Sequence, residues 1–167
     1  MSEIDRLLAA NAAYAATPPT PSGPRPTRRL AVVTCMDARI DVFAVLGLSL
    51  GEAHVIRNAG ARVTEDVLRS VTLSSGVLGT DTVVVVQHTG CGLAGVTDDE
   101  LRERTGADLA FHAIADHAEA LRQDVDVLAG AEHLTGLTTV AGFVYDVESG
   151  EIDDVCRWER PAEGSAG

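Results

Sequence analysis

Two cysteines and a histidine stand at the ends of predicted strands, where their side chains could bind one ligand together. Cys35 follows the apolar run 30–34, and His88 ends the run 82–88, with Cys91 shortly after it. If the two strands are neighbours, two thiolates and an imidazole converge at one edge of a sheet. This donor set suits tetrahedral zinc, and three protein ligands leave the fourth position open, as in catalytic zinc sites.

A simpler interpretation treats the same residues as ordinary core side chains. A single His-x-x-Cys pair is a weak signal, and a free cysteine often behaves as a small buried hydrophobic residue. Two separate strand-end thiols together with a strand-end histidine favour the metal site instead. Gly90 and Gly92 allow the tight turn that returns Cys91 to the side of His88. Cys156 is the remaining thiol, and as a fourth ligand it would make the site structural.

Strands that alternate with helices are predicted to position these residues. Short apolar runs are typical of buried parallel strands; they cover residues 30–34, 53–58, 82–88 and 138–147, with a short final strand around 152–158. Helical spacing covers 64–78, with Thr64 as a candidate cap. The capping box Thr97-Asp-Asp-Glu100 begins a second helical region, which we expect to continue to about residue 129.

The predicted fold class is α/β, a mostly parallel sheet flanked by helices, with a strand order of about 2-1-3-4 and a possible extra edge strand. Such sheets bind ligands at the carboxyl ends of strands where the order reverses, which here is between strands 30–34 and 82–88. We expect an N-terminal amphipathic helix and Pro-rich arm over 1–29, one α/β zinc-enzyme domain over 30–160, and a flexible tail over 161–167.

The charge and composition exclude several classes of partner. The formal net charge is −12, and all 13 basic side chains are Arg. An acidic body repels nucleic acid and anionic lipid, so a small neutral or weakly charged substrate is expected. Without lysine there is no Schiff-base chemistry and no P-loop lysine.

Neither a signal peptide nor a membrane span is recognisable, and three cysteines do not form a disulfide framework, so a cytoplasmic location is predicted.

The motifs together resemble the paired signature of β-carbonic anhydrases. The signature consists of Cys35-x-Asp37-x-Arg39 and His88-x-x-Cys91, and the stretch Arg57-Asn-Ala-Gly60 resembles the family's second conserved segment. The likeness runs from about residue 30 to residue 156. The short spacing between the two halves of the signature is similar to that of the compact members of the family.

This resemblance implies the reversible hydration of carbon dioxide to bicarbonate, with Zn²⁺ held by Cys35, His88 and Cys91. Zinc lowers the pKa of its bound water and generates hydroxide near neutral pH. Arg39 can bind the Asp37 carboxylate in bidentate fashion, so that Asp37 stays ionised and orients the hydroxide. A second hypothesis is that Asp37 leaves Arg39 at acidic pH and closes the zinc site. The alternative is that Asp37 and Arg39 form only a surface salt bridge without a catalytic role.

The same resemblance implies that the active-site cleft lies at a subunit interface. We therefore expect a homodimer or a dimer of dimers in which the N-terminal helix on its Pro-rich arm contacts the partner. Asn58, Gly60 and Gly90 are expected to line the cleft and to contact the carbon dioxide or bicarbonate.

Two other functions remain as alternatives. The first is the hydrolysis of carbon disulfide or carbonyl sulfide on the same scaffold, and the second is a non-catalytic zinc-binding fold. A further motif, Gly47-Leu-Ser49-Leu-Gly51, matches a nucleophile elbow but lacks the strand-before, helix-after context and is interpreted as a loop. The remaining histidines, at positions 54, 112, 117 and 133, are expected to be structural or solvated. His112 and His117 are expected to lie on one helix.

Overall fold

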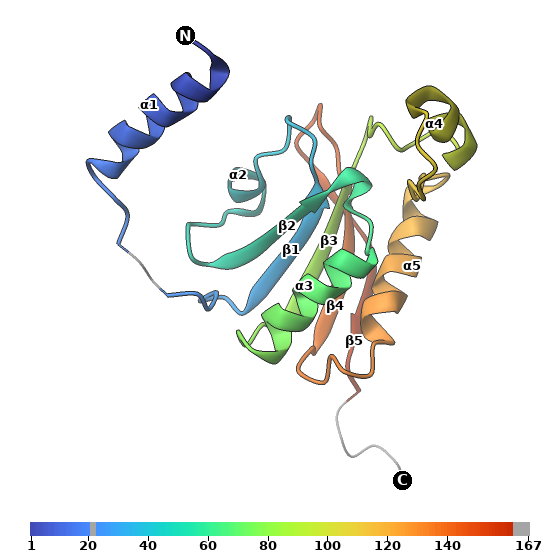
Figure 1. The fold of residues 1–167 in the computed structure, drawn as a ribbon. Coiled ribbons are helices and arrows are strands. Elements are labelled where there is room, and N and C mark those ends of the chain that lie inside the picture. Colours follow the sequence, from blue (N-terminus) through green and yellow to red (C-terminus); the bar gives the residue numbers. More distant parts are fainter. Residues whose placement is uncertain (21–22, 162–167) are drawn as a thin grey trace.

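A computed structural model describes residues 1–20 and 23–161 of the chain (Figure 1). Helices and strands alternate through most of this length. The helices are α1 (Glu3–Ala15), α2 (Val42–Leu46), α3 (Glu65–Gly76), α4 (Asp98–Thr105) and α5 (His117–Ala129), with a short 3-10 turn, η1 (Ala59–Ala61). The strands are β1 (Leu30–Cys35), β2 (Ala53–Asn58), β3 (Thr82–His88), β4 (Thr139–Tyr145) and β5 (Ile152–Glu159).

The five strands form one sheet in the order β2-β1-β3-β4-β5, which confirms the predicted order and the extra edge strand. The first four strands are parallel, and β5 pairs antiparallel with β4. The register places Cys35 opposite Asn58 and Thr34 opposite Val86. Cys35 and His88 therefore lie at the same carboxyl edge, on the two neighbouring strands between which the order reverses.

Valine-rich strands bury side chains on both faces of the sheet, as their continuous apolar runs predict. On one face α3 and α5 lie side by side (Figure 1) and contribute Val67, Val71, Leu121, Val125 and Leu128 to the core. On the other face the core includes Ile40 and Val42 at α2, together with the loop residues Leu48 and Leu93. The core thus holds the strand ends rigidly from both sides.

The region predicted as one helix from Thr97 to residue 129 is two helices separated by the 106–116 loop, so that expectation was wrong. Gly106 ends α4 in the left-handed conformation, with φ 70°, and its N–H donates to the Arg102 carbonyl. Asp116 caps α5 through the N–H of Glu119. His112 lies in this loop and not on a helix. The capping box at the start of α4 is confirmed.

The N-terminal segment contains α1 and an arm that leads to β1. None of the α1 residues is buried, and the helix lies away from the sheet in Figure 1.

Thr64 precedes α3 at the cap position, but its side chain accepts no capping hydrogen bond. Within the described ranges, no helix has both the length and the apolar composition needed to cross a bilayer. The division of the chain at residues 29 and 160 stays a prediction, and residues 162–167 of the expected tail lie outside the described residues.

The packing of α5 against the sheet leads to a stability prediction. Leu121 is fully buried, whereas Leu109 in the 106–116 loop is 59% exposed. Leu121→Ala should lower the free energy of unfolding by about 3 kcal/mol, because it leaves a cavity in a close-packed core. Leu109→Ala, the same chemical change at the surface, should have a much smaller effect. Urea denaturation at a fixed protein concentration measures both, and equal losses would contradict the assignment of this core.

Candidate functional site

The structure brings together the three residues that the sequence singled out as metal donors. Cys35 ends β1, His88 ends β3, and Cys91 lies in the tight turn that follows. The ligand atoms of these three residues lie within 4.8 Å of one another, and all three residues are buried. Two neighbouring parallel strands therefore deliver two sulfurs and one ring nitrogen to a single point, a donor set that suits zinc or another soft divalent metal.

The hydrogen bonds of His88 fit the role of a metal donor. Its Nδ1–H donates to the carbonyl of Thr89 at 2.9 Å, which leaves Nε2 with a lone pair. Nε2 is buried and has no hydrogen-bond partner among the described residues. Burial lowers the pKa of His88, so its ring is neutral, as a metal donor must be. An acceptor atom left unpaired in the core is costly unless a cation binds to it.

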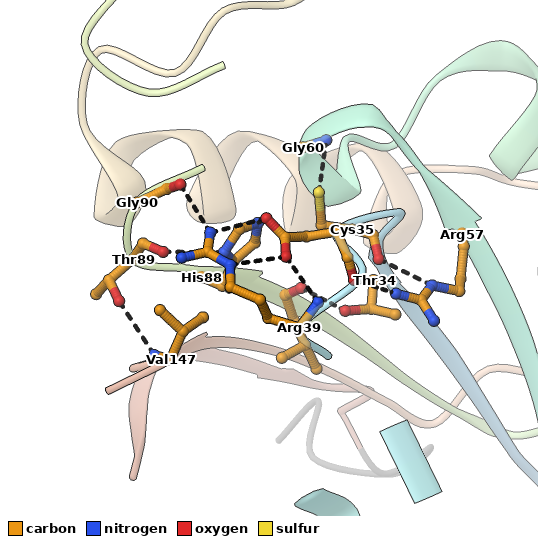
Figure 2. A network of polar contacts seen from close by, with 11 residues as sticks. Thr34, Cys35, Arg39, Arg57, Gly60, His88, Thr89, Gly90 and Val147 are labelled. Atoms are coloured by element: carbon orange, nitrogen blue, oxygen red, sulfur yellow. Dashed lines mark hydrogen bonds and ion pairs between the residues drawn. The ribbon is translucent and has the colours of Figure 1, made fainter. Parts of the chain in front are cut away.

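The two cysteine sulfurs also fit a bound cation. Burial raises the pKa of the Cys91 thiol, and the neighbouring Cys35 raises it further. A divalent cation between the two sulfurs would stabilise the thiolate forms and offset this effect. The backbone N–H of Gly60 donates to the Cys35 sulfur at 3.4 Å (Figure 2). Gly60 has φ 73°, and a Cβ atom there would lie 2.8 Å from the Leu93 side chain.

Asp37 and Arg39 form a bidentate ion pair directly beside the three donors. Arg39 Nε donates to Asp37 Oδ1 at 2.9 Å, and Nη2 donates to Oδ2 at 2.8 Å. The backbone N–H of Arg39 donates to Oδ1 as well. These bonds hold the pKa of the Asp37 carboxyl far below its usual range. Asp37 Oδ2 lies 3.8 Å from His88 Nε2, so the ionised carboxylate faces the donor group.

Two further contacts position this ion pair. The same Nη2 of Arg39 donates to the carbonyl of Gly90 at 3.0 Å, which joins the segment after β1 to the turn after β3 (Figure 2). Arg57 on β2 donates to the carbonyls of Cys35 and Asp37, at 2.9 and 2.7 Å. Arg57 thus holds the backbone of the segment that carries Cys35 and Asp37. The sequence placed Arg57 in a motif but did not predict this contact.

A cavity of about 380 Å³ opens beside the donor group. Its lining is mostly apolar and includes both donor cysteines, Asp37 and Gly60. The large apolar side chains of the wall come from Met36, Leu93, Leu101 and Phe111. A small apolar molecule would fit this cavity better than a strongly charged one.

The other two expected cleft residues have structural contacts. Asn58 donates from Nδ2 to the Arg62 carbonyl at 2.8 Å, and its Oδ1 is buried without a hydrogen-bond partner among the described residues. Gly90, with φ 64°, offers its carbonyl to Arg39. Neither residue lines the cavity described above, whereas Gly60 does.

Residues that the sequence analysis set aside stay away from the donor group. Cys156 lies on β5 opposite Gly142 and does not belong to the group, so the fourth-ligand alternative finds no support. The predicted loop at Gly47–Gly51 is confirmed. His54 contacts Ser74 and the Pro24 carbonyl, and His133 contacts Thr72.

Asp98 and His117 make contacts that the sequence did not reveal. His117 Nδ1 donates to the buried Gln87 Oε1 at 2.8 Å, next to His88 in the chain. Asp98 was interpreted only as part of a helix start, but its carboxylate also binds backbone N–H groups of the 106–116 loop. The contact joins residues that are more than ten positions apart in the chain, so no local sequence pattern indicates it.

Comparisons with known proteins agree on one family. A family model described as carbonic anhydrase matches residues 30–134, which include all three donor residues. β-Carbonic anhydrase 1 of Mycobacterium tuberculosis is 38% identical over 161 residues, or 93% of this chain and 99% of that protein. A carbon disulfide hydrolase of Acidithiobacillus thiooxidans is 42% identical over 151 residues, or 75% of this chain and 76% of that protein. The crystal structure of the Streptococcus mutans carbonic anhydrase is 37% identical with a TM-score of 0.82, covering 93% of this chain and 99% of that one.

The donor geometry predicts which cysteines a bound metal requires. Cys35→Ser and Cys91→Ser should each reduce the metal that copurifies with the protein from stoichiometric to trace amounts, because a hydroxyl is a poor soft-metal donor. Cys156→Ser is the matched control and should keep the full metal content. Inductively coupled plasma mass spectrometry of protein purified without chelators measures all three. Metal retained in both donor variants would contradict the assignment.

Proposed function

Because this chain belongs to the β-carbonic anhydrase family of lyases, we propose that it catalyses the reversible hydration of carbon dioxide to bicarbonate and a proton. The observation that supports this most strongly is the ionised Asp37 carboxylate, held by Arg39 and facing a buried group of two sulfurs and one imidazole nitrogen. A purely structural metal site has no use for a pinned carboxylate beside its donors. The proposal therefore favours a catalytic site over a non-catalytic zinc-binding fold.

In this proposal Cys35, His88 and Cys91 hold Zn²⁺. When bound, zinc supplies Lewis acidity that brings the pKa of a water molecule down to about 7. The donor set of this chain supports zinc because it combines thiolates with a neutral imidazole, and Asp37 is bound to Arg39 and is not one of the three donors. Cysteine donors also require reducing conditions, which supports the predicted cytoplasmic location.

Asp37 orients the attacking water in this scheme. Its ionised carboxylate would accept a hydrogen bond from the remaining O–H of that water, so that the oxygen lone pair points at the carbon of the substrate. Arg39 keeps Asp37 ionised and fixes its direction through two parallel hydrogen bonds. The apolar cavity holds carbon dioxide, with Gly60 in direct contact, while Gly90 and Asn58 act by positioning Arg39 and the η1 turn.

Replacement of Asp37 tests the proposal most directly. Asp37→Asn should lower kcat/KM for carbon dioxide hydration by about a hundredfold, as expected when the group that orients the attacking water is lost. The metal content should not change, because Asp37 is not one of the three donors. Asp66→Asn, which removes an exposed carboxylate on α3, should leave the rate unchanged. Stopped-flow hydration measured on metal-quantified protein provides both numbers.

Replacement of Arg39 should change the pH dependence of carbon dioxide hydration in a defined direction. Because Arg39 lowers the pKa of Asp37, Asp37 in the unmodified chain stays ionised throughout the acidic range. Removal of Arg39 raises that pKa, so Asp37 in Arg39→Ala becomes protonated as the pH falls, and activity should be lost preferentially on the acidic side. An identical pH profile in both proteins would contradict the proposed role of Arg39.

A second candidate substrate class is carbon disulfide or carbonyl sulfide. The relative from Acidithiobacillus thiooxidans is named a carbon disulfide hydrolase, and these linear, apolar molecules also suit an apolar cavity. The metal and the Asp37–Arg39 pair would serve both reactions in the same way. Turnover of the three molecules, measured side by side on one preparation, separates the two candidates.

The exposed apolar face of α1 supports a homodimer or a dimer of dimers. Ile4, Leu7, Leu8 and Tyr14 lie along one stripe of the helix, and each side chain is more than half exposed. A helix of this length is marginally stable alone, so a packing partner would stabilise it. A second copy of this chain is the proposed partner, with the helix carried to it by the N-terminal arm.

A charge on the apolar stripe should weaken this association. Leu8→Glu should shift the protein towards monomer in sedimentation velocity at micromolar concentration, because it places a charge in an apolar interface. Ala9→Glu adds the same charge on the opposite face of α1 and serves as the control. Unchanged assembly in Leu8→Glu would show that the stripe does not contact the partner.

A further inference from the structure

Part of the cavity wall comes from α4 and the 106–116 loop. Leu101 on α4 and Phe111 in the loop line the cavity that also contains the Cys35 and Cys91 side chains. Figure 1 shows α4 beyond the carboxyl end of the sheet, close to the start of α5. The position of Phe111 therefore sets how much room remains beside the donor group.

The Asp98 carboxylate fixes the backbone on both sides of Phe111. Oδ2 accepts the N–H of Phe111 at 2.9 Å and that of His112 at 3.4 Å, and Oδ1 accepts the N–H of Ala113 at 2.8 Å. These hydrogen bonds, with Arg102 nearby at 3.6 Å, keep the pKa of Asp98 below its usual value. Three consecutive N–H groups directed at one carboxylate define the path of the chain at this point.

The conformation held by Asp98 is one that the loop is not expected to adopt unaided. His112 has φ 57°, in the left-handed region that a residue with a side chain rarely occupies. The Arg62 guanidinium donates to the His112 carbonyl at 3.0 Å, and Arg102 Nε donates to the Leu109 carbonyl at 3.0 Å. These contacts and the Asp98 carboxylate compensate for the strained backbone, and the loop has no helix or strand of its own across residues 106–113.

We propose that Asp98 is a positioning residue that sets the width of the cavity by holding Phe111 on its wall. With Asp98 in place, the cavity admits small neutral molecules and excludes larger ones. Only the identity of those small molecules rests on the proposed function. The effect on cavity width depends on the loop alone and does not require catalysis.

The neighbouring Asp99 provides a matched comparison. Its side chain is 92% exposed, and its carboxylate bonds to Arg102 but to no loop N–H among the described residues. Both residues lie in the first turn of α4, so either substitution removes one negative charge near the helix N-terminus. A difference between the two variants therefore reports the loop contacts and not the charge.

The test measures access to Cys35 and Cys91 in reduced, metal-free protein. Rates of labelling are compared for a small reagent, methyl methanethiosulfonate, and a bulky one, fluorescein-5-maleimide, with peptide mass spectrometry to locate the label. Asp98→Ala should raise the bulky-reagent rate at these two cysteines by about tenfold, because hydrogen bonds to a charged acceptor are lost. The small-reagent rate should change little. Asp99→Ala should match the unmodified protein with both reagents.

A double-mutant cycle decides whether Asp98 acts through Phe111. Phe111→Ala should also raise the bulky-reagent rate, and adding Asp98→Ala to it should have no further effect. Additive effects, or an unchanged rate in Asp98→Ala, would overturn the proposal. Cys156 lies outside the cavity and reports general unfolding through its own labelling rate. If Asp98→Ala unfolds by this measure, the isosteric Asp98→Asn takes its place and should show the same selective increase in a smaller degree.

Carbon dioxide hydration by the unmodified protein is measured separately. The labelling ratio does not depend on turnover, so a failure of the proposed function and a failure of the positioning role give different results. An inactive protein with size-selective labelling that Asp98→Ala abolishes would overturn only the proposed reaction. An active protein whose labelling ignores Asp98 would overturn only the positioning role.

Discussion

The Arg39 guanidinium makes the contact on which the rest of the candidate site depends. It binds the Asp37 carboxylate through two nitrogens and the Gly90 carbonyl through one of them. Asp37 belongs to the segment after β1, and Gly90 belongs to the turn after β3. One planar, permanently charged group therefore connects the two segments that carry the cysteine donors. A lysine could not replace it, because a single ammonium lacks the rigid fork of donors that this arrangement uses.

The sheet supplies the precision that this contact needs. Donor atoms within 4.8 Å of one another must come from backbone that hardly moves, and parallel strands buried on both faces provide it. Arg57 extends this rigidity beyond the end of β1 by binding two carbonyls of the following segment. The left-handed turns at Gly60 and Gly90 then complete the approach of the loops.

The sequence allowed the strands to be predicted from local patterns, and their order and the grouping of the donors from general rules for parallel α/β sheets. Valine-rich runs such as 82–88 indicate buried strands, and residues that directly follow neighbouring parallel strands must share an edge. The 106–116 loop was predicted wrongly because residues 97–129 have helix-forming composition at both ends. Its path depends on Gly106, which ends α4, and on side-chain contacts from Asp98, Arg102 and Arg62. Arg62 is distant in sequence, and Asp98 and Arg102 reach the loop because the chain turns back past α4. Such contacts leave no periodic signal.

The 106–116 loop is held by contacts other than those that hold the donor residues, and this affects how the scaffold can diverge. The three donor residues depend on the pairing of β1 with β3, whereas the loop is held by the Asp98 carboxylate at residues 111–113 and by a backbone bridge between Ile114 and Ala94. Insertions or substitutions between α4 and α5 can therefore change the cavity wall while the group of Cys35, His88 and Cys91 keeps its geometry. In a lineage, the shape of the cavity can thus change through this connection alone, without any change at the donor group.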